Sequence, residues 1–268
     1  MRIFITTMDE PFFMNPFIAN ILERRQRDIV GLATSRGGRF TTKRYRFDPS
    51  YAVTFFFIMG LKNSLKTGFR IVIFKVKKKL SHHVLWVTSP SIRQKAQDYG
   101  IPTWDVDSVN SEYMVHILEE LHPDIIINQT QEILNARFIS IPEKGVLNRH
   151  ASLLPKNRGR LTPFWVLFRQ EKETGVTIHF VTPAIDQGDI IAQKKIIVDD
   201  NENFLTLTQK GYHLATDLML ESLDKIESGN YTVMINDPAK GTYNSVPSLK
   251  DALQYRCRIL GRLLKGGK

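Results

Sequence analysis

The chain has 268 residues, one cysteine and a formal net charge of +10 at neutral pH. This length is enough for one large domain with a hydrophobic core, and a single cysteine excludes internal disulfides. The first residues lack the charged and apolar pattern of a secretion signal, so a reducing, cytoplasmic location is expected.

The excess positive charge comes from one segment. Residues 36–80 contain twelve lysines and arginines and a single acid, whereas the other residues contain 25 basic and 26 acidic side chains. A segment of this kind indicates an anionic partner, a class that includes nucleic acid and anionic lipid.

Apolar runs alternate with amphipathic segments through the first half of the chain. The expected strands are 2–7, 28–34, 83–88, 102–106 and 124–128, and the expected helices are 15–27, 91–99 and 111–121. This alternation predicts an α/β fold with a Rossmann-like, doubly wound and mainly parallel sheet. Ligands of such sheets bind beyond the carboxyl ends of the strands.

The second half begins with further strands and ends with helices. Strands are expected at 175–181, 190–198 and 231–235, a long helix at 204–226 and an amphipathic helix at 249–264. We therefore expect a main domain at residues 1–200, which includes the basic insert 36–80, and a small helical and β extension at 201–268.

The insert is apolar as well as basic. Residues 51–61 form a continuous apolar run, but its eleven residues are fewer than the roughly 20 that span a bilayer. Further apolar side chains recur at helical spacing, with lysines mainly on other faces: Leu65, Phe69, Val72, Ile73, Val76 and Leu80. Such a segment suits an anionic membrane surface, the protein's own core or a homodimer, or a polyanion such as tRNA.

The most specific motif is Asn-Arg-His-Ala-Ser-Leu-Leu-Pro at residues 148–155. Asn148 and His150 are two residues apart, so they point to the same side of an extended strand, and Arg149 points to the other. An amide can donate to an oxyanion without titrating, and an imidazole can transfer a proton near neutral pH. Downstream, Asp186 provides a carboxylate that can orient the imidazole.

Each of these residues taken alone also fits a structural role, such as a turn asparagine or a buried histidine. Their order, together with the attached Ser-Leu-Leu-Pro, makes a catalytic set the better interpretation. Asp189 is the second carboxylate of the same loop, and we expect it to cap the turn into the next strand rather than to act in catalysis.

The motif, with Asp186 thirty-six residues after His150, resembles the formyltransferases that use 10-formyltetrahydrofolate. The family includes glycinamide ribonucleotide, methionyl-tRNA and sugar nucleotide N-formyltransferases, and the resemblance extends over residues 80–200. It implies a Rossmann-like catalytic domain, catalytic roles for Asn148, His150 and Asp186, 10-formyltetrahydrofolate as formyl donor, and no metal.

The resemblance also implies a folate pocket. The family's pterin-binding segment matches Gln131, Glu132, Ile133 and Leu134, and the same pocket would be lined by Ser152, Leu153, Leu154 and Pro155. Ile133 and Leu134 are equally consistent with ordinary core residues. Many relatives bind a substrate phosphate with glycine in the first βα turn, but residues 6–15 contain no glycine, so phosphate contacts are not expected there.

The acceptor is predicted from residues 158–175, which look most like the enzymes that formylate amino sugars on nucleotide carriers. Relatives that act on tRNA carry an additional β-barrel, and the roughly seventy residues after residue 200 leave too little room for a helix and a barrel. We expect an amino sugar on a nucleotide or lipid phosphate, with nucleic acid not expected as a partner.

Three alternatives remain open. The first is a methionyl-tRNA formyltransferase-like enzyme without the barrel, and the second is a formyltetrahydrofolate hydrolase. The third is a folate-binding or membrane-scaffold protein without catalysis. A peripheral position at the membrane and a homodimer are both compatible with the exposed apolar residues that the insert predicts.

Overall fold

The computed structural model describes residues 1–36, 49–81 and 90–265, without the side chains of 49 and 262–265. Its strands are β1 (Ile3–Thr7), β2 (Ile29–Ser35), β3 (Thr103–Val106), β4 (Ile125–Asn128), β5 (Val146–His150), β6 (Arg158–Gly159), β7 (Glu173–Phe180), β8 (Ile190–Ile197) and β9 (Tyr243–Asn244). Seven of them form one sheet in the order β3-β2-β1-β4-β5-β7-β8, and β6 pairs with β9. The expected strand at 83–88 lies outside the described residues.

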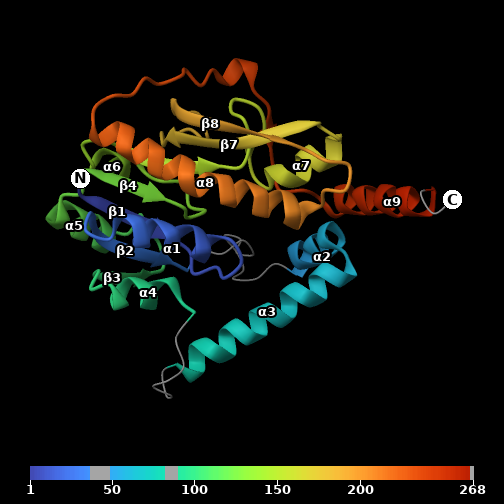
Figure 1. Cartoon of the computed structure of the whole chain (residues 1–268), viewed down its shortest axis with the longest axis horizontal. Helices are drawn as coiled ribbons and strands as arrows, with labels where there is room; N and C mark the ends of the chain where they lie inside the picture. The colour runs from blue at the N-terminus through green and yellow to red at the C-terminus, as the bar shows by residue number, and fades with distance from the viewer. Residues whose placement is uncertain (37–48, 82–89, 266–268) are drawn as a thin grey trace.

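The sheet is mainly parallel, as the sequence predicts. β3, β2, β1, β4 and β5 pair in parallel, and only β7 and β8 are antiparallel to their neighbours. The central strands are apolar on both faces because helices cover both of them (Figure 1). This confirms the doubly wound α/β fold class.

Helices cover the two faces of the sheet in two layers. The helices of the body are α1 (Met14–Arg25), α4 (Ile92–Asp98), α5 (Glu112–Leu121), α6 (Ala136–Ser140), α7 (Thr162–Arg169) and α8 (Phe204–Glu227). One core joins α1, α4 and α8 to one face, and a second core joins α5 and α6 to the other. Side chains alternate between these cores along each strand, so Ile126 faces the second core while Ile125 and Ile127 face the first.

Helix α8 shares the core of the main sheet. Leu207, Ala215 and Leu223 are buried in the same cluster as β1 and β4, and a capping box between Asn203 and Thr206 begins the helix. The division of the chain at residue 200 therefore stays a prediction.

The expected strand at 231–235 is wrong. Only Met234 pairs, through an isolated antiparallel bridge to Ile190, and the segment leads instead to a short 3-10 helix, η1 (Pro238–Lys240). Tyr231, Val233 and Ile235 are exposed, so the apolar composition of this run does not reflect burial in the sheet.

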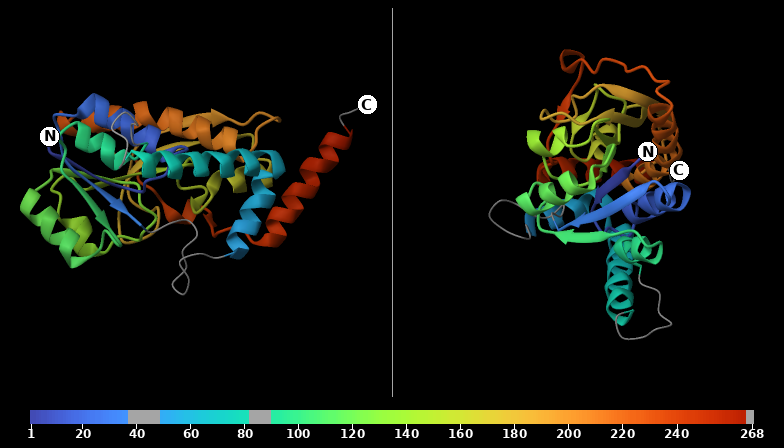
Figure 2. Two further views of the ribbon diagram at one scale, coloured as in Figure 1. Left: turned by 90° about the horizontal axis from the view of Figure 1, so that it is seen from below. Right: turned by 90° about the vertical axis from the view of Figure 1, so that its left-hand side faces the viewer.

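The basic insert contains two helices, α2 (Pro49–Met59) and α3 (Leu61–Leu80). The continuous apolar run lies mostly in α2, which packs on α9 (Leu249–Lys265). Residues of α2, α7, α8 and α9 form a third core: Phe55, Ile58, Phe164, Phe204, Ala252 and Tyr255. For α2, the interpretation as part of the protein's own core is confirmed. Helix α3 lies at the periphery of the molecule (Figures 1 and 2) and has no buried residue.

Within residues 1–36, 49–81 and 90–265, no helix combines the length and apolar character needed to cross a membrane.

Candidate active site

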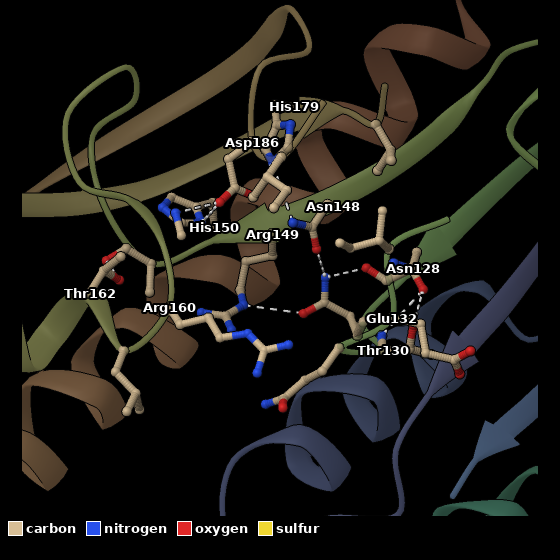
Figure 3. Close-up of a pocket in the computed structure, with 18 of the residues that line it drawn as sticks. Asn128, Thr130, Glu132, Asn148, Arg149, His150, Arg160, Thr162, His179 and Asp186 are labelled. Carbon is tan, nitrogen blue, oxygen red and sulfur yellow. Dashed lines mark hydrogen bonds and ion pairs between the residues drawn. The ribbon is translucent and has the colours of Figure 1, made fainter. Parts of the chain in front are cut away.

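The candidate site is a cleft of about 290 Å³ at the carboxyl ends of β4 and β5 (Figure 3). Its walls come from the loops that follow β1, β4, β5 and β7, and from α2 and α8. This is the sheet edge at which a doubly wound fold binds its ligands. The position of the motif at residues 148–150 on β5 brings it into this cleft.

The structure brings the three predicted catalytic residues together. Asn148 and His150 lie on β5, and Asp186 reaches them from the loop between β7 and β8. The Nδ1 atom of His150 is 3.5 Å from Oδ2 of Asp186. All three line the same cleft, although Asp186 is thirty-six residues further along the chain than His150.

The amide of Asn148 is held in one orientation. Its Oδ1 accepts from Nε2 of Gln129 at 3.1 Å. On the other side, its Nδ2 is 3.3 Å from Nε2 of His179. The Nδ1 of His179 is 2.7 Å from the Phe180 carbonyl oxygen, which can only accept, so Nδ1 carries the proton and Nε2 accepts from Asn148.

His179 is a site residue to which sequence reasoning gave no role. It lies opposite Asn148 in the antiparallel pairing of β5 with β7. Burial and the neighbouring His150 lower the pKa of His179 to about 4, although Asp186 and the Phe180 carbonyl act in the opposite direction. His179 is then neutral at pH 7, so its approach to Asp186 at 3.8 Å is not an ion pair. In the sequence, the two-residue spacing of Thr177 and His179 indicates that both side chains point to the same face of a strand. Which residues of β5 they face depends on how β5 and β7 pair, and the sequence does not show this register.

The segment that follows β5 holds the imidazole of His150 in place. Its Nε2 donates to the Asn157 carbonyl at 2.8 Å, and the hydroxyl of Ser152 donates to the same carbonyl at 3.3 Å. Because Nε2 is used in this way, Nδ1 is the ring nitrogen directed at Asp186.

The expected pocket lining by Ser152, Leu153, Leu154 and Pro155 is not what the structure shows, because the described lining of the cleft contains Ala151 and none of these four. After His150 the chain turns away from the cleft. Ser152 and Leu154 become buried, and the Leu154 amide donates to Oγ1 of Thr177. Ser152 contributes instead to the support of His150, through the Asn157 carbonyl that both contact.

Asp186 is held in an unusual backbone conformation. Its φ is +50°, in the left-handed region that few non-glycine residues adopt. The Gly159 amide donates to its Oδ2 at 2.8 Å, and Asn236 donates to its carbonyl at 3.0 Å. Gly159 is itself required, since a Cβ there would lie 2.1 Å from the Asn244 carbonyl oxygen.

Asp189 is exposed and lies outside the described lining of the cleft. Its backbone carbonyl, rather than a side-chain cap, makes the local contact, by accepting from the Phe180 amide at 2.9 Å. The structure thus places Asp186, and not Asp189, beside His150 in the cleft.

The predicted pterin-binding segment does line the cleft: Gln131, Glu132, Ile133 and Leu134. Glu132 anchors it, because its carboxylate accepts from Ser35, Ser108 and the Val109 amide. Ile133 is 64% exposed while Leu134 is buried. The exposed isoleucine offers an apolar wall on which a flat ring can rest, so the segment fits a folate.

A carboxylate caps the first βα turn. Glu10 accepts from the amides of Phe12, Phe13 and Met14 at 3.0 to 3.1 Å. These amides are the donors at the start of α1 that an external anion would need. The carboxylate of Glu10 satisfies these three donors within the chain.

Two arginines line the cleft beside the catalytic residues (Figure 3). The Arg149 guanidinium stacks 3.9 Å from the centre of the Tyr212 ring, and its Nε donates to Oε1 of Gln129 at 3.2 Å. Arg160 is exposed at the same cleft. Arg149 was expected to point away from Asn148, but its long side chain brings the guanidinium into the same cleft.

The described residues hold no cluster of histidine, cysteine and carboxylate side chains suited to a metal ion. Residues 62–223 match the model of the formyl transferase family.

The chain belongs to the formyl transferase family.

Relatives within the family differ in substrate. Methionyl-tRNA formyltransferase of Kosmotoga olearia is 38% identical over 153 residues, which cover 57% of this chain and 49% of that protein. The chain thus spans about half the length of the curated relatives it matches.

Solved structures of the family share the fold. A sugar N-formyltransferase from Shewanella sp. superposes with a TM-score of 0.57 at 18% identity, over 91% of this chain and 76% of the other. An N-formyltransferase from Helicobacter canadensis, in complex with folinic acid and dTDP-3-aminofucose, has a TM-score of 0.58 at 16% identity, over 91% and 71%. At these identities the likeness establishes the fold and not the acceptor.

Proposed function

We propose that this protein transfers a formyl group from 10-formyltetrahydrofolate to the amine of an amino sugar carried on a nucleotide or a lipid phosphate. The observation that carries the proposal is the convergence of Asn148, His150 and Asp186 in one cleft of a formyl transferase family fold. An amide donor, an imidazole and a carboxylate are the groups that transfer between two nitrogens requires.

Asn148 acts as the oxyanion donor in this mechanism. One hydrogen of its Nδ2 is directed at His179, and the second donates to the formyl oxygen as negative charge develops there. Gln129 and His179 keep the amide from rotating. A donor fixed before the reaction loses no free energy to reorientation in the transition state.

His150 carries the transferred proton on Nδ1, because Nε2 already carries the hydrogen that it donates to the Asn157 carbonyl. It accepts the proton that the acceptor amine loses as its nitrogen bonds to the formyl carbon. It then donates a proton to the folate nitrogen as the old carbon–nitrogen bond breaks. Asp186, 3.5 Å from Nδ1, stabilises the imidazolium between these two steps. The products are the formamide and tetrahydrofolate.

The two arginines support an acceptor that carries phosphate. Arg149 and Arg160 line the cleft, and the two carboxylates of the lining, Glu132 and Asp186, accept hydrogen bonds from backbone amides. Guanidinium groups bind phosphate oxygens well because their donors match the geometry. Since Glu10 occupies the start of α1, the arginines supply the phosphate-binding groups instead.

The experiment is a panel of acceptors incubated with the full chain and 10-formyltetrahydrofolate. The panel contains amino sugars linked to nucleoside diphosphates, an amino sugar linked to a lipid phosphate, methionyl-tRNA, and a sample without acceptor. Mass spectrometry of the products and the release of tetrahydrofolate are measured. Formylation of a phosphate-linked amino sugar supports the proposal, and the two carriers are distinguished by which arm reacts.

The second candidate is a methionyl-tRNA formyltransferase-like activity, which the curated relatives favour. Formylation of methionyl-tRNA but of no amino sugar would establish it and overturn our proposal. Release of tetrahydrofolate in the sample without acceptor would instead identify a hydrolase.

A further inference from the structure

Helix α3 is amphipathic, but its polar face is directed at the body and its apolar face at solvent. The positions that are partly covered by the body are Asn63, Ser64, Thr67, Phe74 and Lys78, four of which are polar. The apolar stripe faces solvent: Leu61, Leu65, Phe69, Val72, Ile73, Val76 and Leu80 are between 38% and 68% exposed. A helix of a soluble domain ordinarily buries its apolar stripe against the core.

The polar face of α3 is the one that holds it to the body. Lys78 pairs with Asp9 in the loop after β1, and the Arg70 guanidinium lies 4.8 Å from the centre of the Phe12 ring. Burial favours the neutral acid, but the hydrogen bonds of Lys78, Asn15 and Ser91 lower the pKa of Asp9. These contacts fix which side of the helix faces outward, so the exposure of the stripe follows from the fold.

The charge of this region decides between the partners that could cover the stripe. Residues 49–81 contain no Asp or Glu, and α3 contains seven cations: Lys62, Lys66, Arg70, Lys75, Lys77, Lys78 and Lys79. A second copy of α3 would bring the same charges and no acid to meet them, so self-association through this helix is opposed. Nucleic acid would bind the lysines but would leave the apolar stripe in water.

We propose that α3 docks in the plane of an anionic phospholipid surface. The apolar stripe would enter the boundary between headgroups and acyl chains, and the flanking lysines would contact lipid phosphates with their charged ends. The helix has 20 residues, but with seven cations it is not apolar enough to cross the bilayer. This inference rests on α3 alone and does not depend on the proposed function.

The cleft is connected to this helix through α2. Tyr51 of α2 lines the cleft, and Phe55, one turn later, contacts Phe204 at 5.4 Å between ring centres. Only Gly60 separates α2 from α3. A protein docked through α3 thus has its cleft joined to the membrane surface by one short helix.

The test is flotation of the full chain with vesicles of phosphatidylcholine, with and without phosphatidylglycerol. The variant Leu65→Ser/Phe69→Ser/Val72→Ser removes apolar surface but no charge. The matched control is Tyr113→Ser/Ile197→Ser/Ile235→Ser, whose side chains are similarly exposed (62%, 63% and 83%) but lie on other elements. Far-ultraviolet circular dichroism establishes that both variants remain folded.

We expect the protein to bind vesicles that contain phosphatidylglycerol and to bind pure phosphatidylcholine more weakly. The α3 variant should bind at least about tenfold more weakly, because three apolar side chains no longer leave water. The control variant should bind like the original chain. Equal binding to the two kinds of vesicle, or unchanged binding of the α3 variant, would overturn the proposal.

Two further measurements separate the other partners. In Phe69→Trp, the indole emission should shift to shorter wavelength only with anionic vesicles, and Tyr113→Trp should show no shift. Sedimentation velocity without lipid tests the second copy. A dimer that the α3 variant dissociates, in a protein that does not float, would replace the membrane with a homodimer interface. Binding to tRNA without flotation would likewise refute the proposal.

Discussion

The cleft and helix α3 differ in where their polar and apolar side chains lie. In the cleft, buried and half-buried polar groups are joined in a continuous network that runs from Arg149 through Gln129 and Asn148 to His179. On α3, apolar groups are exposed and polar groups face the protein. This network is held together within the chain, since its four side chains contact one another. The apolar stripe of α3, by contrast, leaves water only when a surface outside the chain covers it.

This comparison predicts that the two regions separate experimentally. Substitutions in the network should change catalysis and stability without altering vesicle binding. Substitutions on the apolar stripe should do the reverse when the acceptor is soluble. A variant that changes both properties would show that the regions are coupled.

The largest effect is expected at the catalytic residues. Asn148→Ala removes the oxyanion donor, and Asp186→Ala removes the carboxylate beside His150. Each should reduce kcat by a factor of about 10² to 10³, measured with the acceptor that the panel identifies. Asp186→Asn keeps a side chain that tolerates positive φ and isolates the charge. Near-normal turnover by Asn148→Ala would remove it from the mechanism.

A second prediction concerns the pH dependence of stability. The pKa of His179 falls from 6.5 to about 4 on folding, so the unfolded chain binds more protons between these values. The free energy of unfolding should therefore decrease as the pH falls through this window, by about 2 kcal/mol between pH 7 and pH 5. Urea denaturation measures it. His179→Gln should lack this component, and an identical pH dependence in the variant would contradict the assignment.

Arg149→Met tests the phosphate contact. The variant keeps much of the side-chain volume over Tyr212 but removes the guanidinium. We expect KM for a phosphate-linked amino sugar to increase about tenfold, with a smaller effect on a simple amine acceptor. An equal loss with both acceptors would indicate that Arg149 acts through Gln129 on Asn148 rather than on phosphate.

The smallest effect is expected at Asp189. Its side chain is exposed and lies outside the described cleft lining, and its local contact uses the backbone. Asp189→Asn should keep kcat and KM within about twofold of the original values, since surface substitutions of this kind perturb little. A large loss of kcat would mean that the loop has been assigned the wrong carboxylate.

Much of the fold and of the central site could be predicted from the sequence. The alternation of strands and helices indicated the parallel sheet, and the spacing of Asn148 and His150 placed both on one side of β5. Such periodicities are local, so the sequence shows them directly.

The remainder depends on tertiary contacts. His179 meets Asn148 only because β7 pairs antiparallel to β5 in one register. Ser152 leaves the cleft because the chain turns after His150 to support its imidazole. The helical periodicity of α3 is visible in the sequence, but the side that faces the body depends on Asp9, which lies about seventy residues away from Lys78 in the chain.

The corner at Gly60 links the direction of α3 to the far end of the chain. Arg256 of α9 donates to the carbonyls of Phe57 and Ile58 at 2.8 and 2.7 Å, and Gly60 has a φ of +76° that brings it against the same guanidinium. These hydrogen bonds hold the last turn of α2 against α9, although the two segments are nearly two hundred residues apart in the chain. The orientation of α3 relative to the cleft thus depends on the carboxyl-terminal helix, because Arg256 of α9 holds the turn from which α3 begins.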